Sequence, residues 1–248
     1  MTHFDAESLA PKLISHNRWL NGDNENGERL VLTNAVVEGV KLKSPNFAQA
    51  DFEGVVFLDC DFPNACFQNA RLHSIVFDKS NIRAANFTLA TMEHIDFRQT
   101  NADFSNFHLV YGSGLRVDEQ STLGGAHFRK ARLPHSTFTK TDLSSLDFSG
   151  ADLTDSFFHD VDAKRANFDR TNFNGSRMND GSFAGANMQS AMMVDSNISN
   201  VSFHRTSMRG VNLEGSKLER TDLTAADTTG ANLGRLTFGN AKRDGYAY

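Results

Sequence analysis

The sequence predicts an all-β fold of stacked short coils, a β-solenoid, and two observations carry this prediction. First, a bulky apolar residue recurs at every fifth position over two long stretches of the 248-residue chain. Second, the chain has 21 Phe against 3 Tyr and 1 Trp, which indicates that one ring fills the same kind of site repeatedly. Neither the helical period of 3.6 nor the strand period of 2 produces a spacing of five.

The first apolar series runs in steps of five from Leu32 to Phe97, and the second runs from Phe128 to Phe238. Of the 21 Phe, 17 lie on these two series. In the second series only Ala163 and Thr228 lack bulk. We call each such residue the centre of a pentad. A single pentad buries too little apolar surface to be stable, whereas stacked pentads bury a continuous column.

The other positions of the pentad are also biased. The residue two before the centre is mostly Ala, Ser or Thr, and the residue just before the centre is often Asp or Asn. Gly is frequent two residues after the centre, where it allows a turn with positive φ at no steric cost. We therefore expect the small residue and the centre to point inward and the other three residues to point outward.

This pattern resembles the repeat of the pentapeptide-repeat family, as in Ala151-Asp152-Leu153, Ala166-Asn167-Phe168 and Ala231-Asn232-Leu233. The resemblance covers about residues 30–240. It implies a right-handed quadrilateral β-helix with four pentads per coil. The four-sided coil comes from the resemblance, because the period of five does not by itself fix the number of pentads in a coil.

Residues 1–29 differ from the repeats and are predicted to cap the solenoid. Residues 8–20 have apolar residues near helical spacing, with Ser8 as the expected helix cap and Pro11 in the first turn. Residues 21–29 form a polar linker. Many members of the family have a His and a Trp-Leu pair ahead of the repeats, as His16 and Trp19-Leu20 stand here. Such a cap covers the exposed sheet edge of the first coil.

The repeats are expected in two blocks, 30–107 and 127–240, of one continuous domain. The register continues through Ala102 and Phe107 or slips so that Phe104 is a centre, and we favour the first. An inserted loop is then expected at 108–126, with its body at 109–125, which contains Gly at four positions. Unstructured loops of this length are often functional, but solenoids also tolerate insertions at little cost. A functional loop would contact a partner through Tyr111, Leu115, Arg116, Asp118 and Glu119.

The last coil has no following helix to cover it, because the chain ends in the short tail 241–248. Two arrangements are open. The tail folds back so that Tyr246 or Tyr248 covers the end, or two molecules meet there as a homodimer.

The sequence contains no recognisable catalytic or cofactor-binding motif, so we expect a non-enzymatic protein without cofactor or metal. Cys60 and Cys66 suit neither a disulfide framework nor a zinc site. With 25 basic and 30 acidic residues, no nucleic-acid-binding surface is expected. The N-terminus does not resemble a signal peptide and no long apolar run occurs, so the expected compartment is the cytoplasm.

Two surface features are candidates for partner binding. Residues 141–163 contain six Asp and no Lys or Arg, which would form an acidic girdle around one coil. Four of these Asp occupy the Asp/Asn slot of the repeat, and only Asp155 and Asp160 exceed what the repeat requires. Outward apolar residues are rarer, and Met192 and Val194 flank a single centre. The other interpretation of each feature is that it is ordinary surface exposed to solvent, because exposed charges by themselves contribute little.

These observations leave open three functions of different kinds. The first is a cytoplasmic scaffold or adaptor that binds a protein partner. The second follows from the resemblance, since some members of the family imitate duplex DNA and bind DNA gyrase or topoisomerase IV, protecting it from quinolones. The net charge of −5 and the basic residues that interrupt the carboxylates argue against this. The third is a structural or regulatory role with a host-specific partner.

Overall fold

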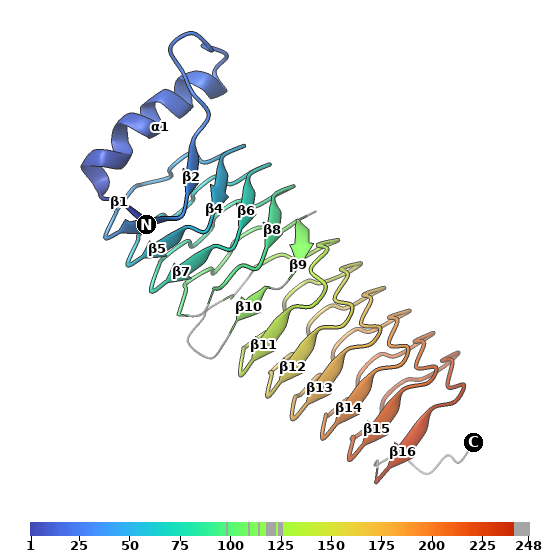
Figure 1. The fold of residues 1–248 in the computed structure, drawn as a ribbon. Helices are drawn as coiled ribbons and strands as arrows, with labels where there is room; N and C mark the ends of the chain where they lie inside the picture. The colour runs from blue at the N-terminus through green and yellow to red at the C-terminus, as the bar shows by residue number, and fades with distance from the viewer. Residues whose placement is uncertain (98, 109, 114, 118–122, 124–125, 241–248) are drawn as a thin grey trace. The chain divides into compact units, whose positions relative to one another are not determined.

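The computed structural model describes residues 1–97, 99–108, 110–113, 115–117, 123 and 126–240. The chain divides into two compact units, residues 1–126 (unit 1) and 127–248 (unit 2). Within its described residues each unit is a parallel β-solenoid, and the one helix lies at the start of unit 1 (Figure 1).

Unit 1 begins with a strand and a helix and continues as coils of short strands. Its elements are β1 (Thr2–Phe4), α1 (Ala6–Leu20), β2 (Val31–Thr33), β3 (Ala35–Glu38), β4 (Asp51–Glu53), β5 (Val56–Leu58), β6 (Arg71–His73), β7 (Val76–Asp78), β8 (Thr91–Glu93), β9 (Tyr111–Ser113) and β10 (Arg116–Val117). Two parallel sheets result, with strand orders β1-β3-β5-β7 and β2-β4-β6-β8-β9.

Unit 2 repeats one strand per coil. Its strands are β11 (Thr137–Thr139), β12 (Phe157–His159), β13 (Arg177–Asn179), β14 (Asn197–Ser199), β15 (Lys217–Glu219) and β16 (Thr237–Gly239). They stack in chain order as one parallel ladder. The other sides of each coil are joined by single parallel bridges, such as Asp147 to Asn167.

The ladders show that one coil contains four pentads. Phe138 pairs with Phe158 and Phe158 pairs with Met178, so stacked residues are 20 apart in the sequence. Unit 1 has the same spacing, as in the pairing of Val31 with Asp51. The predicted solenoid with four pentads per coil is therefore confirmed in both units.

The centres form stacked columns inside each unit. The rings of Phe67 and Phe87 are stacked 4.7 Å apart, and Phe107 continues that column at 4.9 Å. In unit 2 the rings of Phe128 and Phe148 are 4.5 Å apart. These distances match the separation of about 4.8 Å between neighbouring strands, so each ring contacts the ring of the next coil. The bias toward Phe follows from this repeated stacking.

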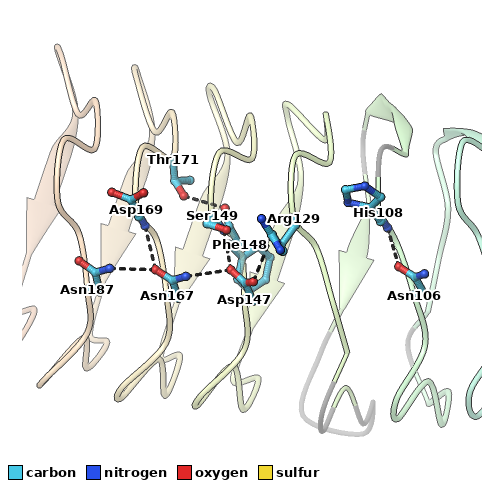
Figure 2. Close-up of polar contacts among 10 residues, drawn as sticks. All are labelled: Asn106, His108, Arg129, Asp147, Phe148, Ser149, Asn167, Asp169, Thr171 and Asn187. Carbon is cyan, nitrogen blue, oxygen red and sulfur yellow. Dashed lines mark hydrogen bonds and ion pairs between the residues drawn. The ribbon is translucent and has the colours of Figure 1, made fainter.

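At the small position two residues before each centre, Ser and Thr can replace Ala because their hydroxyl groups form hydrogen bonds to the backbone. The Thr171 hydroxyl donates to the carbonyl of Phe148 at 2.8 Å (Figure 2), and the Ser196 hydroxyl donates to the carbonyl of Phe173 at 2.9 Å. Both hydroxyls are buried. Because each has a backbone acceptor in the preceding coil, burying it does not leave an unpaired polar group.

The predicted N-terminal helix is present but begins earlier than expected. Its N-cap is Asp5 rather than Ser8, and the Asp5 carboxylate accepts the Ser8 N–H at 2.8 Å. The Ser8 hydroxyl in turn accepts the Asp5 N–H at 3.0 Å, which completes a capping box. The Ser8 hydroxyl also donates to Asp5 Oδ1 at 2.6 Å, and this bond together with the one from the Ser8 N–H lowers the pKa of Asp5. The structure also adds β1, which the sequence did not predict and which pairs with β3.

The helix attaches to the first coil through the buried side chains of Leu9 and His16. His16 Nε2 donates to the carbonyl of Ala48 at 3.0 Å, and Nδ1 accepts the N–H of Leu30 at 3.0 Å. An accepting Nδ1 requires a neutral imidazole. Burial lowers the pKa of His16, and the positive charge of Arg29 lowers it further, while the bond to Ala48 acts in the opposite direction.

The prediction of an inserted loop at 108–126 is wrong for those of its residues that the structure describes. β9 pairs with β8 in the regular register, with Gly112 opposite Met92, and Arg116 bridges to Asp96. Val110, Leu115 and Val117 are buried. The pentads therefore continue to a centre at Val117. The sequence concealed this because Gly112 is itself a centre. A Cβ at Gly112 would run into the backbone carbonyl of Met92.

Candidate protein-interaction surface

An Asp or Asn side chain in the slot before a centre can close the turn of its own pentad. In Figure 2, the Asp147 carboxylate accepts the Ser149 N–H at 3.0 Å and the Asn167 side-chain amide at 3.0 Å. Asn167 accepts the amide of Asn187 in the same way, at 3.0 Å. Short polar side chains that bond the backbone two residues on favour turns. Where Asp or Asn occupies the slot, its side chain can therefore close a turn within its pentad and join a polar ladder between coils.

The predicted acidic girdle consists mainly of such structural carboxylates. The carboxylates of Asp142, Asp152 and Asp162 accept the N–H groups of Ser144, Thr154 and Lys164 at 2.8, 3.2 and 3.1 Å. Basic side chains also lie against them. Arg129 is 3.6 Å from Asp147, Arg132 is 3.8 Å from Asp152, and Lys164 is 2.8 Å from Asp162. Three of the six carboxylates of the girdle thus lie beside a basic side chain, so the girdle is not a continuous array of unpaired negative charges.

Three predicted surface residues share one side of unit 2, which we call the Met192 face. This face comprises the outward residues of the pentads centred on Leu133, Leu153, Phe173, Met193, Leu213 and Leu233. Asn174 joins two of the predicted residues, since its carbonyl accepts the Asp155 N–H at 2.9 Å and its side-chain oxygen accepts the Val194 N–H at 2.9 Å. Met192 lies on the other side of the same centre and is 43% exposed. Asp155, Met192 and Val194 therefore belong to one surface.

Asp160 does not belong to the Met192 face. It lies at the turn after the pentad centred on Phe158, one whole side of the coil beyond Asp155, and its N–H donates to the carbonyl of Asn179 at 2.9 Å. The neighbouring His159 faces Asp180, with Nδ1 3.5 Å from the carboxylate. The structure places Asp160 on the surface but separates it from the other candidates.

The residues proposed for the loop have different environments. Leu115 is 1% exposed and belongs to the core, so it has no surface to offer a partner. Arg116 is exposed in β10, and Tyr111 begins β9. Asp118 and Glu119 lie outside the described residues, as does the tail with Tyr246 and Tyr248. The proposed contact therefore loses Leu115, and its remaining members are untested.

One exposed aromatic residue was missed by the sequence reasoning. Phe104 is 54% exposed at a turn with φ of 59°, and the Arg83 guanidinium lies over its ring at 4.6 Å. The signal was available, because a large aromatic residue at the turn position departs from the repeat. Leu89 occupies the same pentad position and is also exposed.

Two observations on the described residues concern metal binding and thiol chemistry. No group of three His, Cys, Asp or Glu among them is placed to hold a metal ion. Burial raises the pKa of the Cys60 thiol to about 11, and its Sγ donates to the carbonyl of Val37 at 3.2 Å. Such a thiol stays protonated near neutral pH, which opposes a role as nucleophile. No described helix is long and apolar enough to cross a membrane.

A 20-residue coil with four inward centres and parallel ladders defines the class of four-sided parallel β-solenoids. The chain belongs to the pentapeptide-repeat family. The model of the pentapeptide repeat region matches residues 31–107, and the model of pentapeptide repeats in eight copies matches residues 121–160, 166–205 and 206–242. The second model therefore also covers part of the segment that the sequence analysis predicted as a loop.

Solved structures of several proteins are similar to this chain. HetL, a pentapeptide repeat protein involved in heterocyst differentiation regulation from the cyanobacterium Nostoc sp. strain PCC 7120, is 17% identical, with a TM-score of 0.51. That match covers 99% of this chain and 100% of HetL. ORF18 of Geobacillus virus E2 is 9% identical with a TM-score of 0.50, covering 90% of this chain and 55% of that one.

A trypsin-treated form of QnrB1, a plasmid-mediated fluoroquinolone resistance protein, is 21% identical with a TM-score of 0.49. The match covers 77% of this chain and 90% of that one. No protein in the comparison with curated sequences matches. At these identities the similarity establishes the fold alone.

Proposed function

We propose that this protein is a non-enzymatic scaffold that binds a protein partner through the Met192 face. The supporting observation is the exposure of Met192 at a position where the coils on either side carry Asn172 and Asn212. The Asp/Asn slot does not need a long apolar side chain. Met is enriched in protein interfaces, and its flexible side chain adapts to different partner surfaces.

The surroundings of Met192 suit a partner with mixed chemistry. Val194 adds a half-buried apolar side chain beside it, and Asp155 and Asp195 add carboxylates at the edge of the same face. An apolar centre with a charged rim is the usual composition of a protein interface. A partner that presents an apolar side chain between basic groups would complement this face.

The repeat itself provides the test variant. Met192→Asn/Val194→Asn gives these two positions the residues of the preceding coil, Asn172 and Asn174. The fold should therefore persist while the apolar surface is lost. The matched control is Leu89→Asn, which removes an exposed apolar residue from unit 1, where the coil before has Asn69 at the same turn position.

Tagged wild-type and variant proteins are used to capture partners from a lysate of the native host, with mass spectrometry of the eluates. We expect a partner that is retained by the wild type and the Leu89→Asn control and lost at least tenfold with the double variant. Equal retention by all three proteins would exclude the Met192 face. An Arg116→Glu variant in the same series tests the contact proposed near β10. Deleting residues 112–123 is unsuitable, because it removes the buried Leu115 and Val117.

The alternative, a DNA-mimicking protein that binds DNA gyrase or topoisomerase IV, stays a prediction from the family resemblance. Its carboxylate array is weakened because Asp147, Asp152 and Asp162 each lie against a basic side chain. A gyrase supercoiling assay with and without a quinolone tests it directly. The absence of both inhibition by the protein and protection from the drug would rule this alternative out.

A homodimer through the C-terminal end is a separate proposal. The inward side chains of the last described coil are incompletely covered, and Phe238 is 37% exposed. Such an apolar contact would persist at high salt. Sedimentation in about 500 mM salt, where charged contacts are screened, should then show a dimer, and a monomer at micromolar concentration would reject it.

A further inference from the structure

The turn positions of unit 2 form vertical columns at the corners of the coils. Each turn residue has positive φ, and its N–H donates to the next coil, so that residues 20 apart lie above one another. One column contains Asp155, Gly175 and Asp195, connected by the Asp155 N–H to Asn174 and the Gly175 N–H to Val194. We call these three turns, which lie between His135 and Arg235 in the same column, the acidic corner.

A second column has the opposite charge and the same design. It contains Arg165, Gly185 and Arg205, connected by the Arg165 N–H to the carbonyl of Ala184 at 3.1 Å and the Gly185 N–H to the carbonyl of His204 at 2.9 Å. We call this column the basic corner. In both corners a Gly separates the two charged residues.

The spacing of the charges is the same in the two corners. Asp155 and Asp195 are two coils apart, as are Arg165 and Arg205, and two coils rise by about 10 Å. The coil rise fixes both distances, so the match does not depend on side-chain adjustment. A second copy placed alongside in parallel or antiparallel orientation could pair both carboxylates with both guanidinium groups at once.

These four side chains are available for such a contact. All four are exposed, and none of them forms an ion pair with another described residue. Two other charged turn residues do have such a partner, since Arg170 lies 3.8 Å from Asp169 and Asp180 lies 3.5 Å from His159. The intervening Gly175 and Gly185 have no side chain that would hold a partner away.

We infer that unit 2 associates side by side with a second copy of this chain, the acidic corner of one copy meeting the basic corner of the other. The two corners are ten residues apart, which is half of a 20-residue coil, so they lie on opposite corners. A copy bound at one corner therefore leaves the other corner free. This is a head-to-tail contact that does not close, and larger assemblies should grow with concentration.

The inference goes beyond the proposed scaffold function, and it is tested on the purified protein without any partner. Sedimentation velocity is measured in about 20 mM and about 500 mM salt, where exposed charges interact strongly and weakly, respectively. We expect the weight-average sedimentation coefficient of the wild type to rise with protein concentration only in the low-salt buffer. A coefficient that does not change with salt at any concentration would overturn the inference.

Charge reversal identifies the surfaces. Arg165→Glu/Arg205→Glu and Asp155→Arg/Asp195→Arg should each abolish association alone, because both corners then have one sign. Mixing the two variants should restore it. The matched control is Lys130→Glu/Arg170→Glu, another basic pair two coils apart with Gly150 between its members. Loss of association in this control, or failure of the mixture to associate, would overturn the assignment to these corners.

Discussion

Lowering the pH should weaken the attachment of α1 to the first coil, because His16 is held there as a neutral ring. Its Nδ1 accepts the Leu30 N–H, and a protonated imidazole cannot accept a hydrogen bond. The ring is fully buried and stacks on Trp19 with centroids 5.7 Å apart. Protonation therefore requires either a buried charge or release of the helix.

The size and direction of this effect follow from the pKa of His16. Folding lowers it below the ordinary value of 6.5, whereas the unfolded chain keeps about that value. Between the two values the unfolded chain binds more protons than the folded one. The free energy of unfolding should then fall by up to about 1.4 kcal/mol per pH unit as the pH drops below about 6.5. Above that pH the contribution of His16 is complete and constant.

Urea denaturation at pH 7.5 and 5.5 measures this loss, with His16→Gln as the comparison. The Gln amide can donate and accept hydrogen bonds but does not titrate. The wild type should lose up to about 1.4 kcal/mol more than the variant between the two pH values. Hydrogen exchange in α1 should accelerate over the same range. His127→Gln, which removes an exposed imidazole in unit 2, should retain the wild-type pH dependence. Equal losses in the wild type and His16→Gln would refute the reasoning.

Two matched pairs of substitutions test the coil chemistry by thermal denaturation. Thr171→Val should lower the free energy of unfolding by about 1 kcal/mol, because its hydroxyl has a backbone acceptor. Thr221→Val should be neutral or stabilising, since that buried hydroxyl has no hydrogen-bond partner among the described residues. Gly27→Ala should cost about 1–3 kcal/mol, because a Cβ there meets the backbone of Trp19. Gly234→Ala should cost less, since only side-chain atoms approach its Cβ, the nearest at 3.3 Å. Equal losses within either pair would contradict the corresponding contact.

The sequence predicted the solenoid because its core position has one period and one kind of occupant. The number of four pentads per coil did not follow from that period, because a period of five residues is the same for any number of pentads in a coil. The register was lost at Gly112 because the pattern identifies a centre by its bulk. In this coil the centre is Gly112, which has no Cβ, and the Met92 carbonyl occupies the space that a Cβ would need. β1 was missed because its three residues lie outside the repeat and pair with β3, which follows α1 in the chain.

The candidate surface was only partly predictable. Met192 and Val194 could be recognised as outward apolar residues from the pentad alone. Their connection to Asp155 through Asn174 depends on which residues stack between coils, and this requires the 20-residue coil. The girdle carboxylates that accept hydrogen bonds from backbone N–H groups have a structural role, as their place in the Asp/Asn slot of the repeat suggested. The exposed pair of Phe104 and Arg83 depends on two turns stacking, which no local pattern reveals.

The four-pentad coil also constrains how such a gene can lengthen or shorten. Inserting one pentad would leave every centre buried, yet it would move each later surface residue a quarter of the way around the coil. An inserted pentad between Asp155 and Met192 would therefore separate them onto different sides without damaging the core. Duplication of 20 residues keeps every side aligned and only adds a layer. Changes in multiples of five keep the centres in register, and changes in multiples of twenty also keep the outward residues of each side aligned.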